Sequence, residues 1–242
     1  MYTRRPIHRE NGNILFLILL AIILFVALSY AIMGQRDGSK DASSESMKAK
    51  AAQMIQAAAL MEQTVNRLRL VNGCKDTEIS FENTMVSGYV NAATPADGRC
   101  KVFDKAGGGL SWPDNPSYSK DFDPDYNWTF GGQYIITNVG TSDYELLMHV
   151  HLGGDSNYPS STAAAKKLCE ELDQSLLGQT TQIRDTFPTA QSALFTGVYG
   201  SKTIILGDEV YANALPPGLR SACFQRANSA GGYAFYHVLI AR

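Results

Sequence analysis

The longest apolar stretch of the chain is Ile14–Met33, which contains no charged residue. As a helix, its 20 residues would span ~30 Å, the thickness of a bilayer's hydrocarbon core. Basic residues precede it at Arg4, Arg5 and Arg9. Because positive charge favours the cytoplasmic side, the pattern predicts a membrane-embedded helix over residues 13–33 and a cytoplasmic leader over residues 1–12.

A cleaved secretory signal peptide is the alternative interpretation of this stretch. Signal peptides usually have a shorter apolar region of about 7–15 residues, so the length favours retention. Ser29 and Ala31, however, have the spacing of small residues that signal peptidase requires. Under this alternative the mature protein would start at Ile32.

A second helical pattern follows a polar joint at residues 34–43. Its apolar positions recur at alternating steps of four and three, at Met47, Ala51, Met54, Ala58, Met61, Val65 and Leu68. Such a heptad stripe predicts an amphipathic helix over residues 44–73, which the Asn72-Gly73 pair would end. The stripe fits packing on the protein's own sheet, and it also fits additional packing against other subunits.

Beyond residue 74 the pattern is mostly that of strands. Residues 128–139 and 144–152 predict two long strands, and residues 163–177 predict one further helix closed by Gly178. The last strand, from Gly232, is apolar on both faces, which predicts a position inside a sheet that is covered on both sides.

The expected fold class is therefore α+β. A long membrane-embedded N-terminal helix continues into an amphipathic helix, and a mostly antiparallel β globular domain with one further helix follows. The expected divisions are a leader (1–12), a transmembrane helix (13–33), a flexible joint (34–43), the amphipathic helix (44–73) and a disulfide-stabilised globular domain (74–242).

Four cysteines fit a domain outside the cytoplasm: Cys74, Cys100, Cys169 and Cys223. Their even number predicts two disulfides, for which three pairings are possible. Pairing between neighbours in the sequence, Cys74–Cys100 and Cys169–Cys223, would close one loop in each half of the domain. Four buried free thiols are the alternative.

Composition and motifs give little sign of chemistry. A hydrophobic content of 45% indicates a globular protein, and a net charge of −2 disfavours a nucleic-acid partner. No nucleophile elbow is present, and the chain is expected not to be an enzyme. His149 and His151 share one strand face and could hold a metal with Asp155, but two surface histidines on an edge strand are the favoured interpretation.

A loop between Pro113 and Trp128 holds the most notable polar cluster. Its carboxylates alternate at Asp121, Asp123 and Asp125, an arrangement that suits calcium, with a solvated acidic loop as the alternative. No other cofactor is expected. Aromatic residues flank the cluster at Trp112, Tyr126 and Trp128. They would stack on a glycan or a partner protein if exposed, or anchor the loop to the core if buried.

The order of these segments resembles the type IV pilin and pseudopilin family. The resemblance rests on a short basic leader ending in Gly12, a charge-free segment, an amphipathic continuation and a disulfide-bonded, mostly β domain. It implies that a prepilin peptidase cuts between Gly12 and Asn13. The family usually has a glutamate at the fifth mature position, where this chain has Leu17. Minor pseudopilins at filament tips also lack it, so the resemblance favours a minor subunit.

The resemblance implies a structural role. We expect a subunit of a pilin-like filament or its tip complex, held in the bacterial inner membrane before assembly, with its globular domain in the periplasm or on the filament. Its partners would be other pilin-like subunits, the prepilin peptidase and membrane lipid. A membrane-tethered periplasmic module that binds a glycan or partner protein is the second hypothesis.

Overall fold

The computed structural model describes residues 18–25, 40–113, 127–141, 143–155, 162–180, 183–185, 194–200, 204–207, 213–227 and 231–242. For residues 40–43, 154, 155, 204 and 231 it describes the backbone alone. The chain divides into two compact units, Met1–Ser46 and Met47–Arg242, which are described separately below.

The N-terminal unit corrects the expected fold class. Residues 18–25 form a helix, and the remainder of the apolar stretch lies outside the described residues. Within the described parts of the chain, none of the helices has the length and apolar character to cross a membrane. The expectation of a long membrane-embedded helix in the fold is therefore wrong.

Helix α2 (Lys40–Leu70) begins inside the expected joint and carries the predicted stripe. Six of the seven stripe positions, from Ala51 to Leu68, are buried, and Met47 packs partly against them. The helix ends where Gly73 adopts a positive φ of 69° and the Cys74 N–H donates to the Leu68 carbonyl over 3.1 Å. Glycine suits this left-handed cap, so the predicted amphipathic helix and its end are confirmed.

Within the part of the chain that the structure describes, six strands form one sheet in the order β3-β5-β6-β2-β1-β4. Their bounds are β1 (Thr129–Ile136), β2 (Glu145–Asp155), β3 (Arg184–Asp185), β4 (Ile204–Leu206), β5 (Ser221–Arg226) and β6 (Gly231–Ile240). The pairs β1–β2, β2–β6 and β5–β6 are antiparallel, whereas β1–β4 and β3–β5 are parallel. The sheet is mixed, which corrects the expected mostly antiparallel domain. The two parallel strands are only two and three residues long, too short for a periodic signal.

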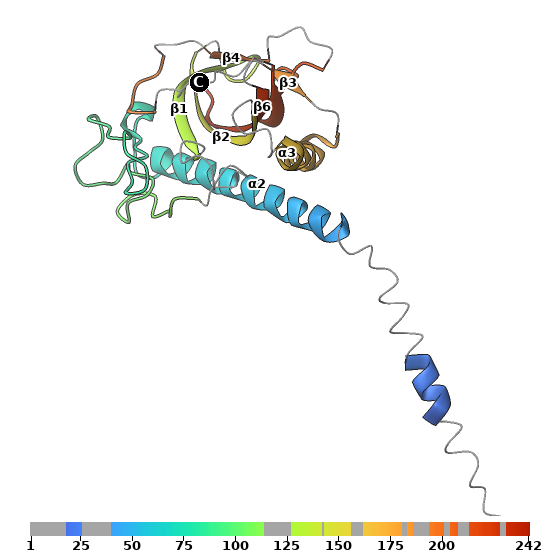
Figure 1. Ribbon diagram of the computed structural model, residues 1–242. Coiled ribbons are helices and arrows are strands. Elements are labelled where there is room, and N and C mark those ends of the chain that lie inside the picture. Colours follow the sequence, from blue (N-terminus) through green and yellow to red (C-terminus); the bar gives the residue numbers. More distant parts are fainter. Residues whose placement is uncertain are drawn as a thin grey trace, which may run out of the picture. The chain divides into compact units, whose positions relative to one another are not determined.

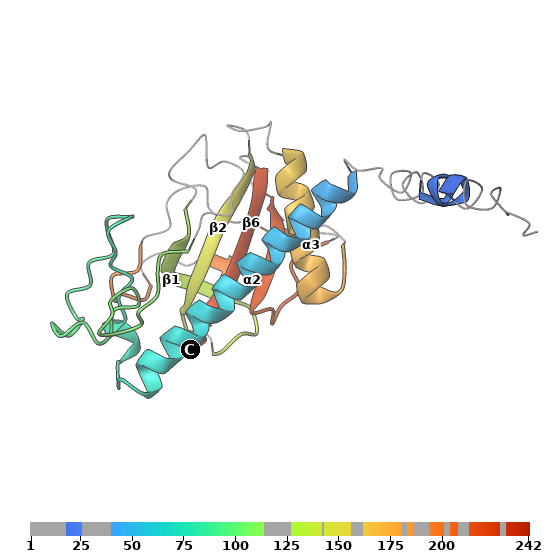
Figure 2. The same cartoon turned by 90° about the horizontal axis from the view of Figure 1, so that it is seen from below.

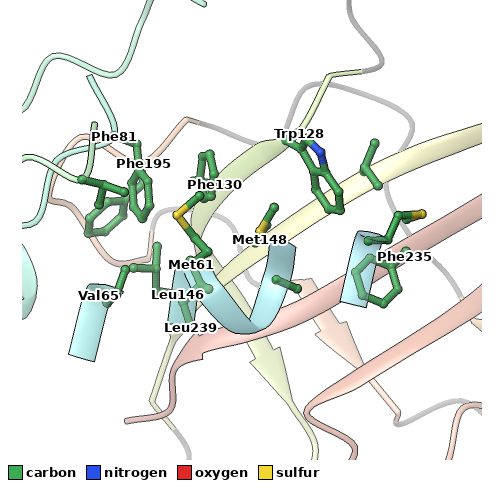
Figure 3. Close-up of a cluster of buried hydrophobic side chains, with 14 of the residues drawn as sticks. Met61, Val65, Phe81, Trp128, Phe130, Leu146, Met148, Phe195, Phe235 and Leu239 are labelled. Atoms are coloured by element: carbon green, nitrogen blue, oxygen red, sulfur yellow. The ribbon is translucent and has the colours of Figure 1, made fainter. Parts of the chain in front are cut away.

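Helices α2 and α3 (Thr162–Leu177) pack on the same face of the sheet (Figure 1, Figure 2). Strand β6 divides its side chains between this outer face, with Tyr233 and Phe235, and the inner face, with Ala234 and Tyr236. The last strand is thus buried on both faces, as its sequence predicts. Figure 3 shows the outer core, in which Met61 and Val65 of α2 approach Leu146 and Leu239 of the strands.

A loop-rich segment, residues 75–113, packs against β1 and contains the short 3-10 helix η1 (Asp76–Glu78). Phe81 of this segment stacks on Phe130 of β1 with ring centroids 4.1 Å apart. The disulfide Cys74–Cys100 joins the segment to the end of α2. Aromatic packing and one covalent bond therefore replace regular secondary structure here.

The inner face is nearly closed because the edge strands β3 and β4 approach each other. The Asp185 carboxylate of β3 accepts a hydrogen bond from the Gly207 N–H, which directly follows β4, over 2.8 Å. Arg184 also bonds to the backbone of Asn213 and Leu215, at 2.8 and 3.0 Å. The sheet thus encloses a second core, which includes Tyr134, Ile136, Leu147, Ile183, Leu206, Phe224 and Val238.

Candidate functional site

Polar side chains gather inside this enclosed face. We call them the inner row: Tyr134 of β1, His149 and His151 of β2, Asp185 of β3, Arg226 of β5 and Tyr236 of β6. All are buried except His151, which is partly exposed. Buried ionisable groups are costly unless they are paired, so such a row is a candidate functional site.

Two contacts fix the geometry of the histidines. The Tyr134 hydroxyl lies 2.7 Å from His149 Nε2, and Arg226 Nη1 lies 3.1 Å from His151 Nδ1. A guanidinium only donates, so His151 Nδ1 must accept, which a neutral imidazole does and a protonated one does not. The rings of His149 and His151 are 6.2 Å apart. The row is therefore built around an uncharged His151.

Burial sets the protonation of the row. It holds the pKa of His149 well below its usual value, and the neighbouring His151 acts in the same direction. Burial also raises the pKa of Tyr236, with the carboxylates of Asp185 and Asp173 adding to the effect. Burial therefore disfavours a charge on both His149 and Tyr236.

The positions of His149 and His151 correct the favoured interpretation of them as surface residues. They share one strand face, as expected from their spacing, but β2 lies between β6 and β1 in the middle of the sheet. Among the residues with described side chains, no group of three or more His, Cys, Asp or Glu is arranged to hold a metal ion. The side chain of Asp155, the third residue of the predicted metal cluster, lies outside the described part of the structure.

A second polar cluster joins α2 to the strands. The Glu62 carboxylate contacts Arg220 Nη2 at 2.6 Å and His237 Nε2 at 3.0 Å, and Ser221 bonds to His237 Nδ1. Since a carboxylate only accepts, Nε2 donates to Glu62 and the Ser221 hydroxyl donates to Nδ1. Burial lowers the pKa of His237, while Glu62 opposes the shift.

This serine–histidine–glutamate order resembles a nucleophilic relay, but the surroundings favour a structural role. A hollow of about 610 Å³ beside α2 is lined by Glu62 and five further α2 residues, and Ser221 is not among them. One oxygen of Glu62 binds Arg220, which directly precedes β5, and the other binds His237 of β6. Both contacts therefore join α2 to the sheet. The cluster therefore fixes the rotation of α2 on the sheet.

Helix α3 is attached to β5 by two bonds. Cys169 forms a disulfide with Cys223, and one turn further on Asp173 Oδ1 accepts a hydrogen bond from the Cys223 N–H over 3.0 Å. Burial raises the pKa of Asp173 to about 7. With Cys74–Cys100 also formed, both sequence-local pairings are confirmed, and no described cysteine is free.

The remaining predicted site residues are only partly described. Trp128 is buried against Phe235, and Trp112 is half-buried beside Tyr89, Phe103 and Phe130. Both tryptophans thus anchor the core. The calcium candidates Asp121, Asp123 and Asp125, the aromatic Tyr126 and the processing residues Gly12 and Asn13 lie outside the described residues.

One sequence signal could have located the inner row. A last strand that is apolar on both faces must lie in a sheet that is covered on both faces, and the strands paired with it are then covered on both faces as well. His149 and His151 belong to such a neighbour, because β2 pairs with β6. Arg226 and Asp185 gave no comparable signal, since their proximity arises from pairing between segments far apart in the sequence.

Comparisons with protein-family models, curated proteins and solved structures find no match to this chain. The residues and their geometry therefore carry the functional argument.

Proposed function

We propose that this protein is a structural subunit of a pilin-like or pseudopilin-like filament, or of the complex at its tip. The observation that carries the proposal is the two-sided character of α2. One side is buried on the sheet along six stripe positions. On the other side, Ala52, Gln53, Gln56, Ala59, Leu60 and Gln63 are exposed.

The exposed side of α2 suits contact with another apolar or uncharged helix. Glu62 is the single charged residue between Ala51 and Asn66, and it is engaged by Arg220 and His237. Leu60 is 47% exposed beside the hollow lined by Gln56, Ala59, Gln63 and Asn66. A solvated helix face of this length normally carries charges, so their absence supports a partner at this surface.

The two disulfides support a globular domain outside the cytoplasm. Both are buried, and such bonds persist in oxidising compartments. In this proposal the domain lies in the periplasm or on the filament, the inner membrane is the location before assembly, and the leader meets the prepilin peptidase in the cytoplasm. No catalytic role is assigned. The glycan-binding alternative gains no support from Trp112 and Trp128, which lie in the core.

Crosslinking tests the subunit contact. A photo-reactive amino acid at Gln63 on the exposed side of α2 should crosslink to a second pilin-like chain in cells, because that side is expected to face a neighbour. The same residue at Gln174, which is exposed on α3, is the matched control and should crosslink at least about tenfold less. Equal crosslinking at the two glutamines, or none at either, would contradict the proposed contact. The readout is the mass and identity of the crosslinked product.

Processing gives an independent test. We expect mass spectrometry of the protein from cells to find a mature N-terminus at Asn13. Gly12→Ala should abolish the cut, because prepilin peptidases of the family that the chain resembles cut after glycine. Gly38→Ala, beyond the cut, should leave it unchanged. An intact Met1 would support a plain anchored module instead, and a start at Ile32 would show secretion.

A further inference from the structure

Helix α2 carries a second heptad pattern on the side that faces away from the sheet, the side seen in Figure 2. Its positions recur at alternating steps of four and three, as those of the buried stripe do. At ~100° per residue, they lie ~150° around the helix from the buried stripe. All are exposed except Asn66, which is half-buried. We call this set the outer seam: Ala52, Gln56, Ala59, Gln63, Asn66 and Leu70.

The side chains of the outer seam suit contact with an identical surface. Its two alanines allow a second helix to approach closely, and the amides of Gln56, Gln63 and Asn66 each carry donors and an acceptor, so each can bond to a copy of itself. The Asn66 Oδ1 accepts a long bond of 3.5 Å from Arg69, whereas its amide N–H groups bond to none of the described residues. Leu70 is 84% exposed.

Charges of opposite sign flank the seam. Glu62 lies on one flank and lines the hollow beside α2, and Arg67 lies on the other flank and is exposed. Arg67 Nη2 donates to the carbonyls of Gly107 and Gly108 at 3.3 and 2.6 Å, which holds the guanidinium at this flank. Residues five positions apart on such flanks face each other across two parallel helices in register. Glu62 of one helix would therefore meet Arg67 of the other.

We propose that the outer seam binds the outer seam of a second copy of this chain, with the two α2 helices parallel and in register. Each seam residue then meets its own counterpart, so amide meets amide and leucine meets leucine. Antiparallel helices that bring Asn66 next to Gln56 would instead set the two Glu62 carboxylates together, which disfavours that orientation. The inference rests on the proposed subunit role and deepens it by naming the neighbour at this surface.

Two-fold symmetry favours a second copy over a different chain. A different partner would have to supply amides at the same heptad spacing and opposite charges at both flanks, whereas a second copy supplies both by symmetry. The symmetry also forms the pair between Glu62 and Arg67 twice. Lipid is a poor occupant, because amides without partners are costly in an apolar medium.

Oxidation of cysteine variants of the full-length protein tests the contact. Ala59→Cys should form a disulfide-linked dimer, because parallel helices in register bring the two positions within reach of a disulfide. Gln174→Cys, exposed on α3, is the matched control and should dimerise at least about tenfold less. In a mixture of Gln56→Cys and Gln63→Cys, each variant should pair with itself, because the two positions are ~10 Å apart along the helix.

Sedimentation equilibrium of charge variants tests the flanks. Arg67→Glu should raise the dissociation constant of the dimer about tenfold at low salt, since it sets two carboxylates against each other at each flank, and the effect should shrink at high salt. Arg67→Lys also removes the guanidinium from Gly107 and Gly108 but keeps the positive charge, so it should stay within about threefold of the unchanged protein. Equal weakening by the two variants would contradict the charge pairing.

The remaining outcomes separate this inference from the proposed subunit role. Mixed pairing of Gln56→Cys with Gln63→Cys would overturn parallel packing in register. If the probe at Gln63 captured a different pilin-like chain in cells and Ala59→Cys gave no dimer, the second copy would be overturned and the subunit role would stand. Ala59→Cys dimers of a chain that keeps Met1 would support the seam while the subunit role failed.

Discussion

Phe130→Ala is expected to lower the free energy of unfolding by about 3–5 kcal/mol. Phe130 is fully buried and stacks on Phe81, with an angle of 6° between the rings. Tyr89, Phe103 and Trp112 meet its ring at centroid distances of 5.9, 6.1 and 5.6 Å. The substitution removes the ring at the centre of this aromatic group, and the loop-rich segment, whose one described helix is η1, cannot easily close the cavity.

Denaturant unfolding of the full-length protein would measure the loss as a lower midpoint at unchanged slope. Val198→Ala is the control, because Val198 is 63% exposed and should change stability by less than about 0.5 kcal/mol. A loss below about 1 kcal/mol for Phe130→Ala would show that the loop-rich segment does not depend on this ring. A reduced slope would instead show that the segment detaches from β1 on its own.

The parts of this fold that the sequence predicts correctly have a local periodic signal. The stripe from Ala51 to Leu68 repeats over several turns, and every one of its members is buried. Gly73 and Gly178 both end helices with positive φ angles, as only glycine does readily. The disulfide pairing follows from loop length, since neighbouring cysteines meet most often in the unfolded chain.

The parts that the sequence mispredicts depend on distant segments. Strands β3 and β4 are too short to show alternation, yet they add the two parallel pairs that make the sheet mixed. His149 looks like a surface residue because histidine is polar, but Tyr134 satisfies it from a strand that meets β2 only after folding. The N-terminal expectation rested on the hydropathy and length of one segment and on the basic residues before it, and of that segment the structure describes residues 18–25, which are helical.

The buried polar groups of this domain have opposite pH effects. Asp173 and Glu145 are buried, and burial raises the pKa of each to about 7. A carboxyl group with a raised pKa stabilises the fold fully below its unfolded pKa of about 4 and loses that contribution as the pH rises from there to about 7. His149 acts in the reverse direction below about pH 6.5. Between about pH 4 and pH 6.5 the contribution of His149 to stability therefore partly cancels those of Asp173 and Glu145. Single variants are needed to separate the three.

Replacing both Cys169 and Cys223 by alanine is expected to cost about 4 kcal/mol of stability. The disulfide closes a loop with a sequence separation of 54, and restricting such a loop in the unfolded chain accounts for a loss of this size. The bond also holds α3 on β5 beside the hydrogen bond from the Cys223 N–H to Asp173. Alanine leaves no free thiol to form other pairs, and both positions are buried, so part of the loss comes from the small cavity.

The double variant Cys74→Ala/Cys100→Ala is the matched control, because its disulfide spans a shorter sequence separation of 26. Chain entropy alone makes its loss about 0.6 kcal/mol smaller than that of the Cys169–Cys223 pair. Hydrogen exchange should separate the two variants, with α3 losing protection in the first and the end of α2 with residues 75–113 losing it in the second. If removing Cys169–Cys223 left α3 fully protected, the hydrogen bond to Asp173 and the apolar contacts of Leu168 and Leu172 would be sufficient to hold the helix, and the disulfide would act on the unfolded chain alone.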